Sequence, residues 1–256
     1  MSTPASLELL VELADTEGAA FDRDRVAKGY LPARYTEQWS RPFFAYALPA
    51  LSPGVRILDV GSGRRPTIPR QVLPPDSYYV GLDVDEAELR AAPAGAYDDI
   101  ITADISVASD SVIGQFDLIV SWQVFEHVRS LGDTITNLHR LLSPGGRLVF
   151  MVSGRYALFA ILARLMSHRV RVGAMAKLIG SDPHEKFPTI YDSCYASALE
   201  KLLAQFSYVE ILPRYRGASY FAFWRPLEAG YLLYENLLVR FDKRKWATHY
   251  VVPAVR

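Results

Sequence analysis

A buried-strand pattern that runs straight into two glycines constrains the fold of this chain more than any other feature. Residues 55–66 read Val-Arg-Ile-Leu-Asp-Val-Gly-Ser-Gly-Arg-Arg-Pro. Gly61 and Gly63 allow a sharp turn after the strand, and they let a ligand reach main-chain amides without a side chain in between. A second strand pattern ends at Asp83, where a carboxylate can accept hydrogen bonds from both hydroxyls of a ribose. The sequence therefore predicts a nucleoside site at the ends of two neighbouring strands.

Short apolar runs alternate with helical patterns, an order that is typical of a parallel sheet covered by helices on both faces. The predicted strands are residues 55–60, 78–83, 99–103, 116–121, 147–153, 208–212 and 249–252. Helices are predicted at 85–92, within 123–142 and at 193–204. Pro-Gly-Gly at 144–146 stops the second of these, because neither residue type continues a helix. We therefore expect an α/β fold built on one sheet.

The length of 256 residues suits one large domain, in which four regions are expected. Residues 1–50 contain helical patterns at 6–14 and 36–50 and form an N-terminal helical cap, which either packs against the sheet or folds as a flap over the ligand. Residues 51–153 form the cofactor-binding core. Residues 154–190 and 213–247 are longer than simple connections, and long insertions beside an α/β ligand crevice are usually lids or substrate-binding elements.

The residues around the two glycines distinguish between nucleotide cofactors. A dinucleotide-binding turn has a third glycine three positions after Gly63, and Pro66 stands there instead. Asp59 precedes the turn, and a carboxylate suits the cationic end of a ligand better than it suits a diphosphate. S-adenosylmethionine carries an ammonium and a sulfonium but no phosphate, so it fits this turn better than NAD does.

Five segments in order make the sequence similar to the class I S-adenosylmethionine-dependent methyltransferases, and to their small-molecule, type 11-like branch, over residues 40–153. ILDVGSG resembles the first motif of that family, VGLDVD its ribose-binding acidic motif, and ITADI the segment that ends the third strand. FDLIVSWQVFEHV and LHRLLSPGGRLVF are similar to its later motifs. The resemblance implies S-adenosyl-L-methionine as the cofactor. It also implies a Rossmann-like, doubly wound, seven-stranded sheet that is mostly parallel, with an antiparallel last strand.

The resemblance further implies which residues contact the cofactor. The first motif holds its amino-acid end, Asp83 its ribose, the segment after the third strand its adenine, and the end of the fourth strand the methyl donor. The residues concerned are Asp59, Gly61, Ser62, Gly63, Asp83, Val84, Asp104, Ile105, Ser121 and Trp122. Structural roles stay open for three of them: a helix cap for Asp83, a turn for Asp104 and core packing for Trp122. Arg64, Arg65 and Pro66 depart from the family pattern, so we expect the first helix after the turn to be distorted or displaced.

His127 and His184 are the candidate catalytic residues. His127 follows the fourth strand in Phe-Glu-His-Val, and His184 lies in the first insertion, which is expected to roof the site. A sulfonium methyl is already an activated electrophile, so the protein chiefly aligns it with the acceptor, and a base is needed only for a weakly acidic hydroxyl. A structural role for either histidine stays open. No metal site is predicted, because the sequence has no His-x-x-x-His pair and Cys194 is its one cysteine.

Charge and aromatic content narrow the choice of acceptor. The 28 basic residues balance the 28 acidic ones, and residues 121–124 lack the Pro-Pro-aromatic run of enzymes that methylate nucleic-acid amino groups, so no nucleic-acid partner is expected. Residues 214–246 contain nine aromatic and seven basic residues. This composition favours a lid over a hydrophobic or phosphate-bearing acceptor, peripheral membrane contact, a homodimer interface, or helices that simply pack at the sheet edge.

The predicted function is transfer of a methyl group to an oxygen or nitrogen of a small-molecule acceptor, such as a lipid-linked, glycan or secondary-metabolite intermediate. A non-catalytic, cofactor-binding scaffold protein is the alternative. An NAD-dependent oxidoreductase is a second one, which the missing third glycine disfavours. The N-terminus has no secretory leader pattern, and no apolar run reaches the ~20 residues of a membrane span. The expected location is therefore the cytoplasm, with or without contact to a membrane surface.

Overall fold

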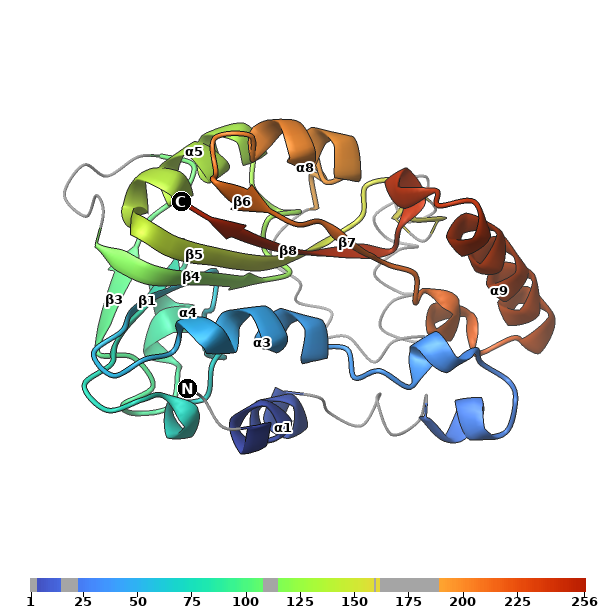
Figure 1. The fold of residues 1–256 in the computed structure, drawn as a ribbon, viewed down its shortest axis with the longest axis horizontal. Coiled ribbons are helices and arrows are strands. Elements are labelled where there is room, and N and C mark those ends of the chain that lie inside the picture. The colour runs from blue at the N-terminus through green and yellow to red at the C-terminus, as the bar shows by residue number, and fades with distance from the viewer. Residues whose placement is uncertain (1–3, 15–22, 108–114, 159, 162–188) are drawn as a thin grey trace.

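The computed structural model of the chain describes residues 4–14, 23–107, 115–158, 160–161 and 189–256, and its strands form one sheet (Figure 1). The strands are β1 (Arg56–Val60), β2 (Tyr78–Asp83), β3 (Asp99–Thr102), β4 (Phe116–Trp122), β5 (Leu142–Ser153), β6 (Tyr208–Val209), β7 (Leu212–Arg214) and β8 (His249–Val255). Their order is β3-β2-β1-β4-β5-β8-β6, and β7 also pairs with β8. The first five strands are parallel, and β8 is antiparallel to β5, which confirms the mostly parallel sheet with an antiparallel last strand.

The sheet has eight strands instead of the predicted seven because its edge strand is interrupted. β6 and β7 pair with β8 in a single register, with Val209 opposite Ala254 and Leu212 opposite Val251. Between these pairs, the N–H of Glu210 donates to the carbonyl of Pro253 at 3.0 Å. Pro253 has no N–H with which to return the bond. The ladder therefore breaks here, and the strand predicted at 208–212 becomes two short ones.

Helices cover both faces of the sheet, and the alternation of side chains along each strand decides which residues meet them. Leu58 and Ile119 share one apolar core with α5 (Leu131–Leu141) and α8 (Ala196–Leu202). Their chain neighbours Ile57 and Leu118 point the other way and share a second core with α1 (Pro4–Ala14) and α3 (Arg41–Ala47). α3 therefore packs against the sheet, so the first of the two alternatives for the N-terminal cap holds for this helix.

The connection from β1 to β2, which the structure describes throughout, contains no α-helix. Residues 61–77 form only the short 3₁₀ helix η3 (Arg70–Val72). The first helix after the glycine turn, which was expected to be distorted or displaced, is thus absent from this connection, because Pro66 and Pro69 cannot donate main-chain hydrogen bonds. Ile68 in this segment is fully buried, and its N–H donates to the Tyr79 hydroxyl at 3.0 Å. The coil thus still covers the sheet where the helix is missing.

The second predicted insertion contains η5 (Ala218–Phe221), α9 (Arg225–Arg240) and η6 (Arg244–Trp246). α9 lies at one end of the molecule, beyond the end of β5 and the start of β8 (Figure 1). Residues of this insertion and of the N-terminal region share a third, smaller core, made of Leu31, Tyr35, Ala218, Phe221 and Tyr231. Most of the first predicted insertion, 154–190, lies outside the described residues. Among those described, no helix combines the length and the apolar character that a membrane span requires.

Candidate cofactor and acceptor site

The glycine turn after β1 requires both of its glycines. Gly61 and Gly63 have φ angles of +72° and +48°, in the left-handed region that other residues rarely adopt. A Cβ on Gly61 would lie 2.4 Å from both methyl groups of Val124, which comes from the segment after β4. The N–H of Gly61 donates to the carbonyl of Leu82 on β2 at 2.6 Å. The turn is therefore held tightly between the ends of β2 and β4.

Asp59 holds the segment that follows the glycine turn through side-chain hydrogen bonds. Its side chain is fully buried, and its carboxylate accepts hydrogen bonds from the N–H and the hydroxyl of Thr67, each at 2.7 Å, and from the hydroxyl of Tyr79. Burial raises the pKa of Asp59 to about 6, although these hydrogen bonds oppose the shift. In this structure the carboxylate holds the loop that follows the glycines. Its direct contact with the amino-acid end of the cofactor stays a prediction.

The raised pKa of Asp59 predicts a pH-dependent stability. Since its pKa of about 6 in the folded protein exceeds the 3.8 of an unperturbed carboxyl, folding favours the protonated form. The stability gained in this way is present below about pH 4 and is lost as the pH rises through about 6. Asp59→Asn cannot ionise, so its free energy of unfolding should rise relative to wild type by up to about 3 kcal/mol between pH 4 and pH 7, measured by urea unfolding. A constant difference over that range would contradict the titration of Asp59.

Asp83 lies beside the turn, as the resemblance implies. Its half-buried carboxylate accepts hydrogen bonds from the main chain of Asp85, Val84 and Gly63, and burial raises its pKa. A Cβ on Gly63 would lie 3.5 Å from its Oδ2. The cap of α4 (Glu86–Arg90) is Asp85, whose side chain accepts from the N–H groups of residues 87 and 88. Asp83 is therefore not the helix cap, and its carboxylate remains at the turn.

The residues predicted near the adenine differ in exposure. Val84 is 53% exposed beside Asp83, where a flat ring can pack on it. Asp104 is exposed and accepts hydrogen bonds from the N–H and hydroxyl of Ser106, at 2.9 and 2.7 Å, so it stabilises a turn. Ile105 is 8% exposed and belongs to the apolar core with α5. Of the three, Val84 is the one whose side chain is open to a ligand without rearrangement.

The end of β4 has a more structural role than predicted. Ser121 is fully buried, and its hydroxyl donates to the carbonyl of Val60 at 3.0 Å, so it joins β4 to β1 instead of lining a floor. Trp122 is half-buried and packs edge-to-face on Phe43 of α3, with ring centroids 5.1 Å apart. Gln123 then reverses the chain direction with a φ of +56°. Ser121 thus links two strands and Trp122 packs on α3, while contact of either residue with the cofactor stays a prediction.

A buried carboxylate that the sequence reasoning missed lies further along the same edge. Glu126 is 3% exposed, and its Oε1 accepts from the hydroxyl of Ser153 at the end of β5, at 2.7 Å. Its Oε2 is buried without a hydrogen-bond partner, and burial raises its pKa. Its charge also helps to raise the pKa of Tyr191 and Tyr220, so these hydroxyls lie near it. Only its position next to His127 in Phe-Glu-His-Val hinted at this group.

Of the two candidate catalytic histidines, the structure describes His127. His127 is half-buried, and its main-chain N–H donates to the carbonyl of Val124 at 2.9 Å. Val124 is also the residue that contacts Gly61. His127 directly follows Glu126 in the segment after β4, and its charge acts on that carboxylate. His184 lies outside the described residues. Catalysis by either histidine stays a prediction.

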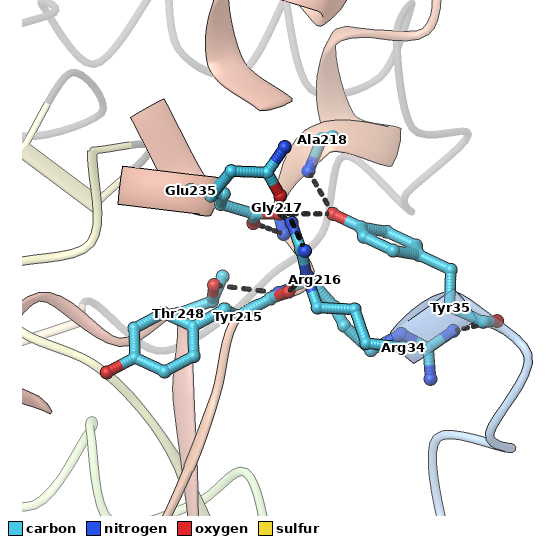
Figure 2. A network of polar contacts seen from close by, with 9 residues as sticks. Arg34, Tyr35, Tyr215, Arg216, Gly217, Ala218, Glu235 and Thr248 are labelled. Atoms are coloured by element: carbon cyan, nitrogen blue, oxygen red, sulfur yellow. Dashed lines mark hydrogen bonds and ion pairs between the residues drawn. The ribbon is translucent and has the colours of Figure 1, made fainter. Parts of the chain in front are cut away.

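A buried polar network borders the site beside β8 (Figure 2). Glu235 of α9 is 1% exposed, and its carboxylate accepts from the hydroxyl of Tyr35 at 2.7 Å, from Arg34 at 2.9 Å and from the N–H of Gly217. The N–H of Ala218 donates in turn to the Tyr35 hydroxyl at 2.9 Å. This network joins the N-terminal region to the second insertion. No sequence motif predicted it.

The network continues to the start of β8. The main-chain N–H of Arg216 donates to the hydroxyl of Thr248 at 3.1 Å. The next residue, His249, is fully buried, and its ring packs on Trp39 with ring centroids 4.6 Å apart. Burial and the nearby cations of Arg214 and Arg216 lower the pKa of His249 to about 3, so this ring is neutral at physiological pH. His249 pairs with Ser153 across β8 and β5, which puts the network on the same edge as Glu126.

The comparison with protein families agrees with this arrangement. Residues 32–206 match a family model described as a methyltransferase domain. The chain belongs to this methyltransferase family. The matched region includes the glycine turn, Asp83 and Glu126, and it confirms the class I S-adenosylmethionine-dependent family that the motifs predict.

The chain is only distantly similar to an individual relative. It is 29% identical over 146 residues to demethylmenaquinone methyltransferase of Symbiobacterium thermophilum, which covers 52% of this chain and 57% of that protein. The chain therefore matches a little over half of that relative's length.

Solved structures share its fold. An S-adenosylmethionine-dependent methyltransferase from Mesorhizobium loti has a TM-score of 0.52 at 20% identity, over 85% of this chain and 97% of that one. Phosphoethanolamine N-methyltransferase 2 of Haemonchus contortus, in complex with S-adenosyl-L-methionine, has a TM-score of 0.50 at 13% identity, over 91% and 59%. These likenesses show the common fold, a Rossmann-like α/β sheet.

Proposed function

We propose that this methyltransferase binds S-adenosyl-L-methionine between the ends of β1 and β2 and transfers its methyl group to an oxygen or nitrogen of a small-molecule acceptor. The observation that carries the proposal is the half-buried Asp83 carboxylate directly beside the left-handed Gly63. The turn fits the cofactor, because both glycines have left-handed φ angles that leave the main chain free of side chains there, and the half-buried Asp83 keeps an acceptor for ribose hydroxyls.

Each residue of the turn has a distinct task in this proposal. The main-chain amides after β1 bind the amino-acid end of the cofactor, Asp83 orients its ribose, and the exposed Val84 packs beside its adenine. Asp59 contributes by keeping the loop in place through Thr67 and Tyr79. When bound, the cofactor supplies a methyl group already activated by its sulfonium. The protein's main contribution is then alignment in a site from which water is excluded, worth about 7–11 kcal/mol in favourable cases.

The acceptor lies, in this proposal, at the ends of β4 and β5 and the start of β8. Glu126 joins His127 as a candidate proton acceptor there, because its Oε2 is unbonded and its raised pKa lets it take a proton more readily than an ordinary glutamate. A non-catalytic scaffold would have no use for an unsatisfied buried carboxylate, which costs stability. The curated relative is named for demethylmenaquinone, not for a nucleic acid or a protein, which supports a small acceptor. The lipid-linked, glycan and secondary-metabolite classes stay predictions.

Titration calorimetry with S-adenosyl-L-methionine, S-adenosylhomocysteine and NAD tests the cofactor site. We expect the first two to bind and NAD not to bind. Asp83→Ala should weaken binding of S-adenosyl-L-methionine by about 30- to 150-fold, since a charge-assisted bond to the ribose is worth about 2–3 kcal/mol. Asp85→Ala is the matched control, because it removes a neighbouring carboxylate that caps α4 and should leave the affinity nearly unchanged. NAD binding alone, or equal affinities of wild type and Asp83→Ala, would overturn the proposal.

A further inference from the structure

The charges of α9 are divided between its two faces. The helix contains two glutamates and two arginines. Glu228 and Glu235 are 3% and 1% exposed, and they pair with Arg25 and Arg34 of the N-terminal region. Arg225 and Arg240 are exposed. The acidic side chains are therefore used inside the protein, and only positive charge remains on the outer side of the helix.

The outer side of α9 is also apolar. Leu233, Leu237 and Phe241 are 64%, 46% and 60% exposed. They are four residues apart, so they form one row along the helix and its C-terminal end. The opposite row, with Tyr231, Glu235 and Leu238, is buried against the protein. Large apolar side chains in a continuous exposed row are unusual for a surface that meets only water.

Exposed aromatic and basic residues also flank the helix at both ends. Phe223 and Trp224 precede α9 and are 56% and 57% exposed, and Trp246 follows it at 39%. The exposed charged residues of 223–246 are Arg225, Arg240, Asp242, Lys243 and Lys245, four basic and one acidic. Because α9 lies at one end of the molecule, a flat surface can approach it without meeting the sheet first (Figure 1).

We infer that this outer surface of α9, residues 223–246, binds membranes that contain anionic lipids. Its leucines and aromatic rings suit the boundary between lipid headgroups and acyl chains, and its basic side chains suit the lipid phosphates. A second copy of the chain is a poorer partner, because a symmetric interface would bring two surfaces with the same excess of positive charge together. The inference is independent of the methyltransferase proposal, since it concerns none of the cofactor residues.

Co-sedimentation of the full chain with vesicles tests the inference. The protein should pellet with vesicles of phosphatidylcholine mixed with phosphatidylglycerol, and it should stay in the supernatant with phosphatidylcholine alone. Leu233→Gln with Leu237→Gln should lower the partition coefficient about tenfold or more. Arg240→Glu with Lys243→Glu should lower it by a similar factor, because each basic residue near an anionic leaflet contributes about fivefold.

Two double variants away from α9 are matched controls. Leu9→Gln with Val107→Gln replaces apolar residues that are 43% and 69% exposed, and Arg90→Glu with Lys201→Glu makes the same change of charge on α4 and α8. Both should bind as wild type does. Absence of binding, equal binding to the two vesicle types, or equal losses in the controls would overturn the inference. So would a lipid-free dimer, seen by sedimentation velocity, that Leu233→Gln with Leu237→Gln converts to a monomer.

Discussion

Glu235→Ala is expected to lower the free energy of unfolding by about 3–5 kcal/mol, the range found when one partner of a buried ion pair is removed. The carboxylate receives hydrogen bonds from Tyr35, Arg34 and Gly217, and the side chain is only 1% exposed (Figure 2). Alanine would leave a hydroxyl, a guanidinium and a main-chain N–H without this acceptor in a place that water reaches poorly. Urea unfolding followed by circular dichroism measures the loss.

Glu200→Ala is the matched control for this experiment. Glu200 makes the same type of pair with Arg244 at 3.2 Å, but its side chain is 51% exposed. Surface ion pairs contribute at most about 1 kcal/mol, so the control should stay close to wild type. If Glu235→Ala lost no more than Glu200→Ala, the network in Figure 2 would not hold the N-terminal region on the second insertion.

Gly61→Ala is expected to cost about 2–5 kcal/mol of folding stability and to abolish measurable cofactor binding. The left-handed conformation at φ +72° costs a residue with a Cβ about 1–2 kcal/mol. Contact of that Cβ with both Val124 methyls at 2.4 Å adds overpacking, which costs about 1–3 kcal/mol. Because the turn is held between β2 and β4, relief of the contact moves the main-chain amides that the cofactor needs.

Two further variants separate the causes. Gly95 has nearly the same φ, +75°, and open space around it, so Gly95→Ala reports the backbone cost alone. Adding Val124→Ala to Gly61→Ala removes the two methyl contacts, but it leaves the Cβ of residue 124 at 2.9 Å and the backbone strain, so it should recover part of the stability. Equal losses in Gly61→Ala and Gly95→Ala would show that Val124 does not confine the turn.

The glycine turn with Asp83 beside it was predictable because its signals are local. A strand pattern, two glycines and a carboxylate at the next strand end specify one turn, whatever the rest of the chain does. The disruption of the first helix was predictable for the same reason, since the prolines at 66 and 69 act on their own segment. The interrupted edge strand was not predicted, because the effect of Pro253 depends on its partner, Glu210, being opposite it.

The acceptor side was predicted less well because its residues come from distant parts of the chain. Ser121 was expected to line the site, but it binds the carbonyl of Val60 across the sheet. Glu126 was overlooked in favour of His127, since nothing local reveals that the Ser153 hydroxyl donates to its carboxylate. The aromatic and basic residues of 214–246 were recognised as a group, but which of them face outward depends on the helix orientation.

By itself, then, the sequence determined the α/β class, the family and the nucleoside turn, all of which depend on residues near one another in the chain. Only the tertiary structure decided that Asp59 holds a loop, that Glu126 is buried beside β5, and that the glutamates of α9 pair with arginines more than 200 residues away. The physical reason is that burial and charge pairing are properties of segments brought together. A side chain's local sequence does not record which partner folding will place against it.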